Sequence, residues 1–227
     1  MASTTNSGSA ADTSLLRRIR WPIAITVVVS VARMVGEVRG SITNLSGGRL
    51  AALGITWLAF VFGAWFGYWL ARSGSAPRVR FAPLWGAVML LVIVVAIGWQ
   101  FGPFLERIPD AQTFAELRPA VRTLCGIAST LALLAFVVWP RLAWTMLAYG
   151  IAVRAFVVAQ TWLAKHQGWD THYTKFGPPG CEPADMSTTM FAAATAQMGF
   201  WVAFTVVGGV FAGSVFGRRS SRSSAVS

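Results

Sequence analysis

Charged residues are scarce in this chain. Only 12% of its 227 residues are Asp, Glu, Lys or Arg, whereas 55% are hydrophobic. A soluble domain of the same length carries about twice that charged fraction. Acidic residues are fewer than basic ones, with 8 Asp and Glu against 19 Lys and Arg. This composition argues against a soluble domain and indicates one compact membrane domain.

Sequence motifs of common enzymes and channels are also missing. The chain has no Walker phosphate loop, no GxSxG nucleophile motif and no GxGxxG dinucleotide loop. It has no HExxH zinc motif, no CxxC pair and no TVGYG-type selectivity filter. No apolar segment holds the paired carboxylates of a proton relay. We therefore expect no catalytic residue and no cofactor.

The formal net charge of +11 raises the question of nucleic-acid binding. The basic residues are dispersed between apolar segments, and no helix-turn-helix, zinc-finger or RNP signature accompanies them. Basic residues that flank apolar segments are instead typical of membrane topology. We expect the lipid bilayer, and not nucleic acid, to be the partner.

Six apolar segments are long enough to cross a hydrocarbon core, which takes about 20 helical residues. The sequence predicts an all-α, polytopic membrane helical bundle, with a disordered tail over 1–16, a six-span domain over 17–217 and a basic tail over 218–227. A cleaved signal peptide is disfavoured because the first segment is long and no small-x-small site follows it. The segments are 21–38, 50–71, 81–101, 119–139, 142–163 and 187–216.

Orientation follows from Lys and Arg in alternate loops. Ten lie on the side of the two termini and six on the other side. Because positive residues are retained in the cytoplasm, both termini are predicted to be cytoplasmic. The protein is then expected in a bacterial inner membrane, and the Trp169–Tyr173 loop faces outward.

Small residues four apart predict close helix packing. Gly63 and Gly67 lie in the second segment, and Gly209, Gly213 and Gly217 lie in the last. Such spacing lets helix backbones approach closely within a membrane. Packing within one chain is favoured over a dimer interface.

Two arginines inside apolar segments are the strongest functional signal. Arg33 and Arg154 each lie about a dozen residues from the predicted cytoplasmic end of their segment. An Arg at the centre of a span costs at least about 2.5–3.5 kcal/mol and normally faces protein or water with a partner. Glu37 is placed for an i,i+4 pair with Arg33. Arg154 has no carboxylate on its own helix, so Glu37, Asp170 or backbone carbonyls are its candidate partners.

These residues predict an outward-facing basic pocket. Gln160 lies two turns beyond Arg154, and Asp170 and His172 are placed at the mouth of the pocket. The alternative is that the arginines reach the membrane interface or join helices without binding a ligand. Further residues placed to join the cluster are Gln100, Arg122 and Gln197.

His166, Asp170 and His172 include the only two histidines of the chain. Imidazole and carboxylate can bind zinc, but this spacing is not that of a structural zinc site. We favour a loop anchored at the membrane interface, and we predict no metal. Cys125 and Cys181 both fall toward the outer side, where a disulfide between them is an open alternative.

Several stretches of the C-terminal third form a pattern: Ala148-Tyr149, Arg154, the run Gly168-Trp169-Asp170-Thr171-His172-Tyr173 and the run Phe200-Trp201-Val202-Ala203-Phe204-Thr205. With this pattern the chain resembles uncharacterised bacterial multi-pass membrane proteins. The resemblance implies no activity. It suggests that Arg154 and the Trp-x-Thr-His-Tyr loop belong together.

Three functions are compatible with these patterns. The first is a small transporter or solute-binding membrane protein whose basic pocket takes a small anionic or polar solute. The second is a structural or accessory subunit in which the same side chains join helices. The third, a membrane enzyme that uses Asp170 and His172 as acid and base, is the least favoured because no nucleophile is in evidence.

Overall fold

A computed structural model describes the backbone of residues 7–44, 54–102, 111–175 and 185–223, and the side chains within 17–44, 54–102, 117–175 and 185–217. The described residues form helices and connecting turns, with no β-strand among them. The elements are α1 (Ser7–Val38), α2 (Leu58–Arg72), α3 (Ala82–Phe101), α4 (Ala111–Val138), α5 (Pro140–His166), the 3₁₀ turn η3 (His172–Thr174), α6 (Met186–Ala194), the π-helical segment η4 (Thr195–Trp201) and α7 (Val202–Ser223).

Five helical segments are long and apolar enough to cross a membrane. The predicted all-helical membrane fold is therefore confirmed at this level. The predicted segment 50–71 contains α2, which has 15 residues and a length of roughly 22 Å. Part of this predicted segment lies outside the described residues. The five candidate spans are Arg17–Val38, Ala82–Phe101, Leu117–Val138, Pro140–His166 and Met186–Gly217.

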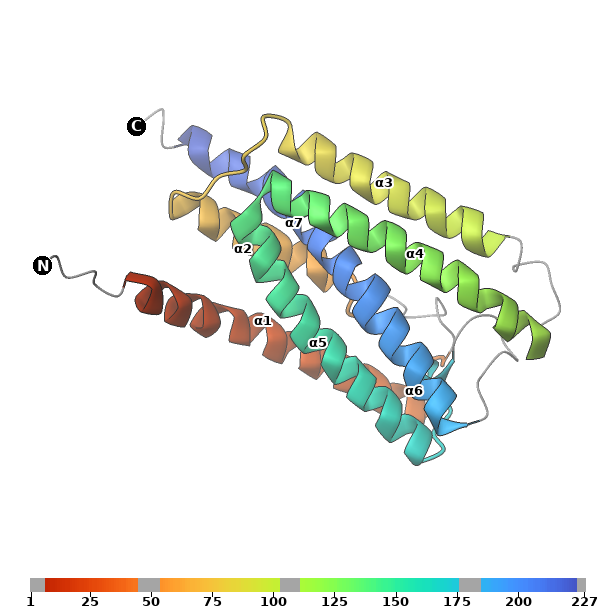
Figure 1. The fold of residues 1–227 in the computed structure, drawn as a ribbon. Coiled ribbons are helices and arrows are strands. Elements are labelled where there is room, and N and C mark those ends of the chain that lie inside the picture. Colours follow the sequence, from red (N-terminus) through yellow and green to blue (C-terminus); the bar gives the residue numbers. More distant parts are fainter. Residues whose placement is uncertain (1–6, 45–53, 103–110, 176–184, 224–227) are drawn as a thin grey trace, which may run out of the picture.

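The helices form a bundle in which direction alternates along the chain. α1, α3 and α5 run one way, and α2, α4 and the continuous unit α6–η4–α7 run the other way (Figure 1). The beginning of α1 and the end of α7 therefore lie at the same end of the bundle, which we call the terminal end. We call the opposite end the distal end.

Helix α1 begins earlier than the sequence predicts. Residues 7–16 belong to the predicted disordered tail, yet the structure continues the helix back to Ser7. Adding residues to an existing helix fixes one residue for each new hydrogen bond, so extension is much easier than nucleation. The same holds for the basic tail, where α7 continues through Ser223.

Glycines bring α2 and α7 into backbone contact. A Cβ on Gly63 would clash with the Cα of Gly209, and a Cβ on Gly67 would clash with the Cα of Gly213. The predicted packing of small residues within one chain is thus confirmed. Helix α7 also packs on α3, α4 and α5, so it forms the centre of the bundle.

A single residue, Trp139, connects α4 to α5. Its indole is fully buried, and its Nε1 donates to Oγ of Ser75 at 3.1 Å. The next residue, Pro140, begins α5, where its missing N–H has no helical partner to lose. The two helices therefore form a tight helical hairpin.

Candidate functional site

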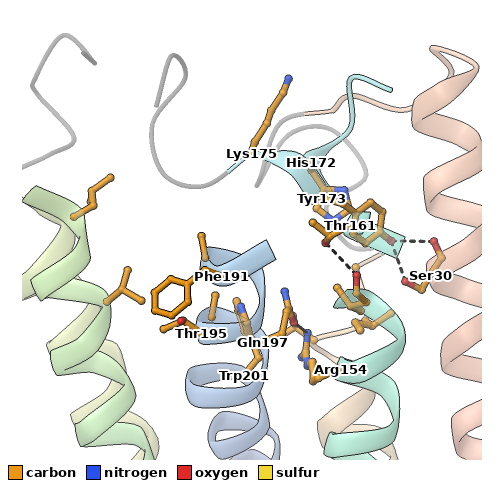
Figure 2. A pocket seen from close by; sticks show the side chains of 18 of the residues that line it. Ser30, Arg154, Thr161, His172, Tyr173, Lys175, Phe191, Thr195, Gln197 and Trp201 are labelled. Carbon is orange, nitrogen blue, oxygen red and sulfur yellow. Dashed lines mark hydrogen bonds between the residues drawn. The ribbon is translucent and has the colours of Figure 1, made fainter. Parts of the chain in front are cut away.

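A cavity of about 740 Å³ lies at the distal end, among α1, α4, α5, η3, α6 and η4 (Figure 2). Among the described residues, six of the lining side chains are basic and none is Asp or Glu. The remaining wall is mostly apolar or aromatic. The basic residues are Arg33, Arg118, Arg122, Arg154, His172 and Lys175, and the larger apolar ones are Ile55, Trp57, Phe60, Phe101, Leu117, Val121, Val157, Phe191 and Trp201.

Arg154 is the most deeply buried of these cations, with 4% of its surface exposed. Its Nη1 donates to Oε1 of Gln197 at 3.3 Å, and its Cζ lies 4.9 Å from the centroid of the Trp201 ring. Its Nε is buried without a hydrogen-bond partner. Neither of the predicted carboxylates, Glu37 and Asp170, is its partner: within the described part of the chain, an amide and an aromatic ring contact the guanidinium instead. A buried charge with so little compensation is costly for a protein to keep.

The π-helical segment η4 supplies both contacts of Arg154. Gln197 and Trp201 are about one π turn apart and lie on the cavity side of the segment. On another side, Gly199 packs against Cys125 of α4, where a Cβ would approach the Sγ to 2.8 Å. A π turn inserted in an α-helix changes the direction of the side chains that follow it, and such turns are frequent at functional sites.

The turn after α5 places the loop of the site. Gly168 has a φ of +66°, the N–H of Gly168 donates to the carbonyl of Lys165, and the N–H of Trp169 donates to the carbonyl of Ala164. This is the Schellman arrangement, which favours glycine because it requires the left-handed conformation. The chain reverses there and lays η3 against α1.

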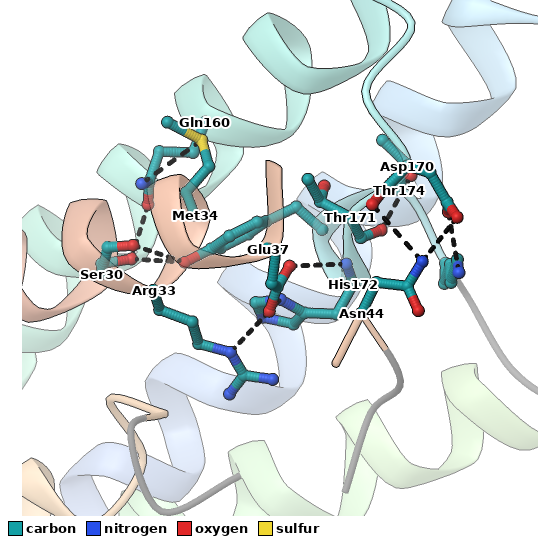
Figure 3. A network of polar contacts seen from close by, with 12 residues as sticks. Ser30, Arg33, Met34, Glu37, Asn44, Gln160, Asp170, Thr171, His172 and Thr174 are labelled. Atoms are coloured by element: carbon teal, nitrogen blue, oxygen red, sulfur yellow. Dashed lines mark hydrogen bonds and ion pairs between the residues drawn. The ribbon is translucent and has the colours of Figure 1, made fainter. Parts of the chain in front are cut away.

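Glu37 joins η3 to α1 (Figure 3). Its Oε1 accepts from Nε of Arg33 at 2.8 Å, which confirms the predicted i,i+4 pair. The same oxygen lies 2.6 Å from Nδ1 of His172, an ion pair when the imidazole is protonated, and Oε2 accepts from the backbone N–H of His172 at 3.0 Å. The Glu37 side chain is fully buried. Its charge is therefore committed to Arg33 and His172 rather than to Arg154.

A second set of contacts fixes η3. The hydroxyl of Tyr173 donates to the carbonyl of Ser30 at 2.9 Å and also lies 2.9 Å from the Ser30 Oγ. The Ser30 hydroxyl donates to Oε1 of Gln160 at 2.6 Å. Burial raises the pKa of Tyr173 to about 12, so the phenol stays neutral at physiological pH.

The structure divides the predicted site residues into two groups. Arg33, Arg122, Arg154 and His172 line the cavity, as does Gln197. Gln160 does not line it, because its amide is used by Ser30 and Met34.

Asp170 is not among the residues that line the cavity, although it contacts the lining residue Lys175. This carboxylate lies 2.8 Å from Nζ of Lys175 and accepts from Nδ2 of Asn44 at 2.5 Å. Glu37 and Gln100 also lie outside the cavity wall.

Sequence reasoning missed several wall residues. Lys175 and Phe191 gave no signal beyond their type, because their place depends on how η3 and α6 pack. Tyr173 and Trp201 stand in the two runs that carry the resemblance to multi-pass membrane proteins, which was the available signal for them.

His166, Asp170 and His172 have separate partners. His166 stacks on Trp162 at 5.2 Å between ring centroids, while His172 and Asp170 have the partners given above. Among the described residues, no three His, Cys, Asp or Glu side chains gather as a ligand set.

The Sγ of Cys125 lies 3.6 Å from the carbonyl of Thr195. Cys181 lies outside the described residues, so a disulfide between the two cysteines stays an open alternative.

Comparison with known proteins returns no relative: no protein-family model, no curated protein and no solved structure matches the chain. The resemblance to multi-pass bacterial membrane proteins therefore stays a prediction. The function has to be argued from the cavity itself.

Proposed function

We propose that this protein is a small transporter or solute-binding protein of the bacterial inner membrane, whose cavity faces outward and binds a small anionic solute at Arg154. One observation carries the proposal. Arg154 is buried in the wall of a 740 Å³ cavity, has no carboxylate partner among the residues that the structure describes and keeps a hydrogen-bond donor unused. A carboxylate, phosphate or sulfate group would supply the missing charge and acceptor.

The proposed topology has six spans and cytoplasmic termini. The shared position of the two chain ends supports an even number of crossings, and α2 is the sixth helix because it packs backbone to backbone on α7. The excess of Lys and Arg on the side of the termini supports their cytoplasmic position. The distal cavity then opens outward.

The charge balance of the wall supports an anion over a cation or a neutral solute. Arg33 is offset by Glu37, and Lys175 is offset by Asp170. Arg154 has no such offset. Its 4% exposure also argues against the alternative that the side chain reaches the membrane interface.

The rival function is a structural subunit in which Arg154 only joins α5 to η4. The two ideas predict opposite effects on the empty protein. A structural contact stabilises, so its removal lowers the melting temperature. A cation kept for an absent ligand destabilises, so Arg154→Met should leave the melting temperature unchanged or raise it.

The test measures anion-induced stabilisation of the purified protein in nanodiscs. The anion panel is sulfate, phosphate, acetate and decanoate, each at constant ionic strength against chloride. At least one anion should raise the melting temperature of the natural protein, and Arg154→Met should abolish that shift. Arg141→Gln is the control, because Arg141 is an exposed arginine at the opposite end of the same helix. A destabilised Arg154→Met variant, together with no response to any anion, would sink the proposal in favour of the structural subunit.

A further inference from the structure

We infer that the ligand of this cavity is an amphiphilic anion, with one acidic group held by Arg154 and an apolar body held by the aromatic wall. The inference rests on the proposed function, which says only that an anion binds at Arg154. It adds the chemical class of that anion. It follows from the size of the cavity, the nature of its wall and the number of unbalanced charges.

The cavity is much larger than an inorganic anion requires. Its volume of about 740 Å³ lies within the range of roughly 300–1,000 Å³ that is typical of sites for drug-sized ligands. A bare sulfate or phosphate at Arg154 would leave most of this space to water. Water against an apolar wall is unfavourable, so an occupant with an apolar body fits the space better.

The wall next to Arg154 is apolar. Trp201 lies under the guanidinium, and the wall continues through Val157 of α5 and Phe60 of α2. Across the cavity, Val121 and Phe191 supply further hydrocarbon from α4 and α6. Sites that hold organic ligands combine a mostly apolar wall with a few placed polar groups, which is the composition seen here.

The charge of the ligand follows from the cations that lack a counter-charge in the wall. Arg33 and Lys175 each have a carboxylate within 2.8 Å. Arg154 alone combines deep burial with an unused donor among the described lining arginines. One acidic group satisfies it. A second acidic group would meet Arg33 or Lys175, whose charges already have a carboxylate, or the exposed Arg122.

The arginine proposed to bind the acidic group lies apart from other basic side chains of the cavity. Arg154, Gln197 and Trp201 lie together, while Lys175 lies apart toward the η3 side of the cavity (Figure 2). The exposed Arg122 belongs to the α4 wall. Basic side chains along a route attract an anion toward it, and the deepest one then retains the acidic group.

The test uses straight-chain carboxylates that share one headgroup: acetate, hexanoate, octanoate and decanoate. Binding is measured by titration calorimetry of the protein in nanodiscs of zwitterionic lipid, with empty nanodiscs as the blank. The affinity should rise about fourfold for each added methylene that becomes buried. A trimethylammonium of the same chain length should not bind, because its charge is opposite.

Two variants test separately how the acidic group and the apolar chain of the ligand contribute to binding. Arg154→Met should weaken every carboxylate of the series by a similar factor, which leaves the dependence on chain length unchanged. Phe191→Ala should reduce the gain from the longest chains and leave acetate unaffected. Phe191 is 63% exposed, so its truncation leaves the helix packing intact. Leu133→Ala removes an equally exposed apolar side chain of α4 outside the cavity and should change nothing.

The ligand could come from the membrane or from solution, and a second arm tells these sources apart. A lysophosphatidic acid is added to the nanodiscs, and decanoate is titrated again. A lower apparent affinity for decanoate means that the lipid anion competes for the site. An unchanged affinity assigns the site to soluble amphiphiles.

Different results would overturn the amphiphile inference and the proposed function. If acetate or sulfate binds in an Arg154-dependent way as tightly as decanoate, the amphiphile inference is overturned and the anion site stands. If no anion binds in an Arg154-dependent way, the proposed function itself is wrong. If decanoate binds equally well to Arg154→Met, its binding is partition into apolar surface and the inference also falls.

Discussion

Glu37 is the carboxylate on which the distal end depends. It accepts from a side chain one helical turn before it and from the backbone of a loop 135 residues later. Both the acid and the Arg33 guanidinium are nearly inaccessible to solvent. Removing one member of a buried ion pair leaves the other charge uncompensated, whereas removing both does not.

This argument predicts the outcome of a double-mutant cycle on Arg33 and Glu37. Glu37→Gln should lower the free energy of unfolding by roughly 3–5 kcal/mol, because it leaves buried cationic groups without an acceptor charge. The double variant Arg33→Gln/Glu37→Gln should recover part of that loss. Denaturant unfolding in detergent measures the free energy of unfolding of the natural protein, the two single variants and the double variant. Additive effects of the two substitutions would show that the pair is not coupled.

The buried hydroxyl of Tyr173 predicts how the stability of the protein changes at alkaline pH. Its pKa is raised by burial to about 12 in the folded protein, and in the unfolded chain it keeps its ordinary value of about 10. The folded state therefore retains a proton that the unfolded state has lost in this interval. Stability should fall as the pH rises through this window.

The measurement is the difference between the natural protein and Tyr173→Phe. Ultraviolet titration of tyrosinate should show that the group lost in the variant ionises near pH 12. The variant should also lose about 1 kcal/mol of stability at neutral pH, through the missing hydrogen bond to Ser30, and should be less sensitive to alkali. A lost group that titrates near pH 10 would mean that Tyr173 is solvated.

The two arginine environments show what sequence reveals about a site. The Arg33–Glu37 pair was predictable because both residues lie on one helix and helical spacing fixes their distance. The Arg154–Gln197 contact was not, since its partners lie 43 residues apart on different helices. The sequence therefore showed that Arg154 needs a partner, but which residue is the partner depends on tertiary packing.

At the scale of helices, α2 and α7 meet through their backbones. The contact depends on the glycines of α2, because a Cβ on Gly63 or Gly67 would meet backbone atoms of α7 and not a movable side chain. Flexible neighbours can adjust to an added methyl group, whereas two helix backbones must separate.

Gly63→Ala and Gly67→Ala are therefore each predicted to lower the free energy of unfolding by about 1–3 kcal/mol. Gly98→Ala and Gly126→Ala are the matched controls: both positions are helical and have open space around the added Cβ. They should be neutral or stabilising by up to about 1 kcal/mol. Equal effects at all four positions would contradict close α2–α7 packing.

The last apolar segment illustrates a partial prediction. Its predicted length, 187–216, exceeds one span by about ten residues. The structure has a continuous helix with a π-helical segment at Thr195–Trp201. The length of the segment was readable from the sequence, but the π turn was not, since within this turn Gly199 packs against Cys125 of another helix.

For the whole molecule, composition and hydropathy were sufficient to predict an all-helical membrane bundle, while the number of spans was not settled by them. Five helical segments reach the length of a span, and α2 is short. Residues 50–71 are apolar enough to suggest a full crossing, but apolarity does not fix where a helix begins. The prediction that residues 1–16 are disordered rested on composition. The extension of α1 to Ser7 shows that residues next to a long helix can join it.

Single cysteines test the proposed orientation. In a background with Cys125→Ala and Cys181→Ala, Ala76→Cys marks the terminal end and Gln167→Cys marks the distal end, both at exposed positions. A membrane-impermeant maleimide applied to intact cells should label Gln167→Cys and leave Ala76→Cys unlabelled. After lysis, both should react. The reverse pattern in intact cells would invert the topology and direct the cavity to the cytoplasm.

The one-residue connection between α4 and α5 constrains how the chain is made. A single residue reaches at most about 3.6 Å, so the start of α5 stays beside the end of α4 at every stage of synthesis. Trp139 leaves no loop that could be lengthened, cleaved or replaced without moving one of the two helices.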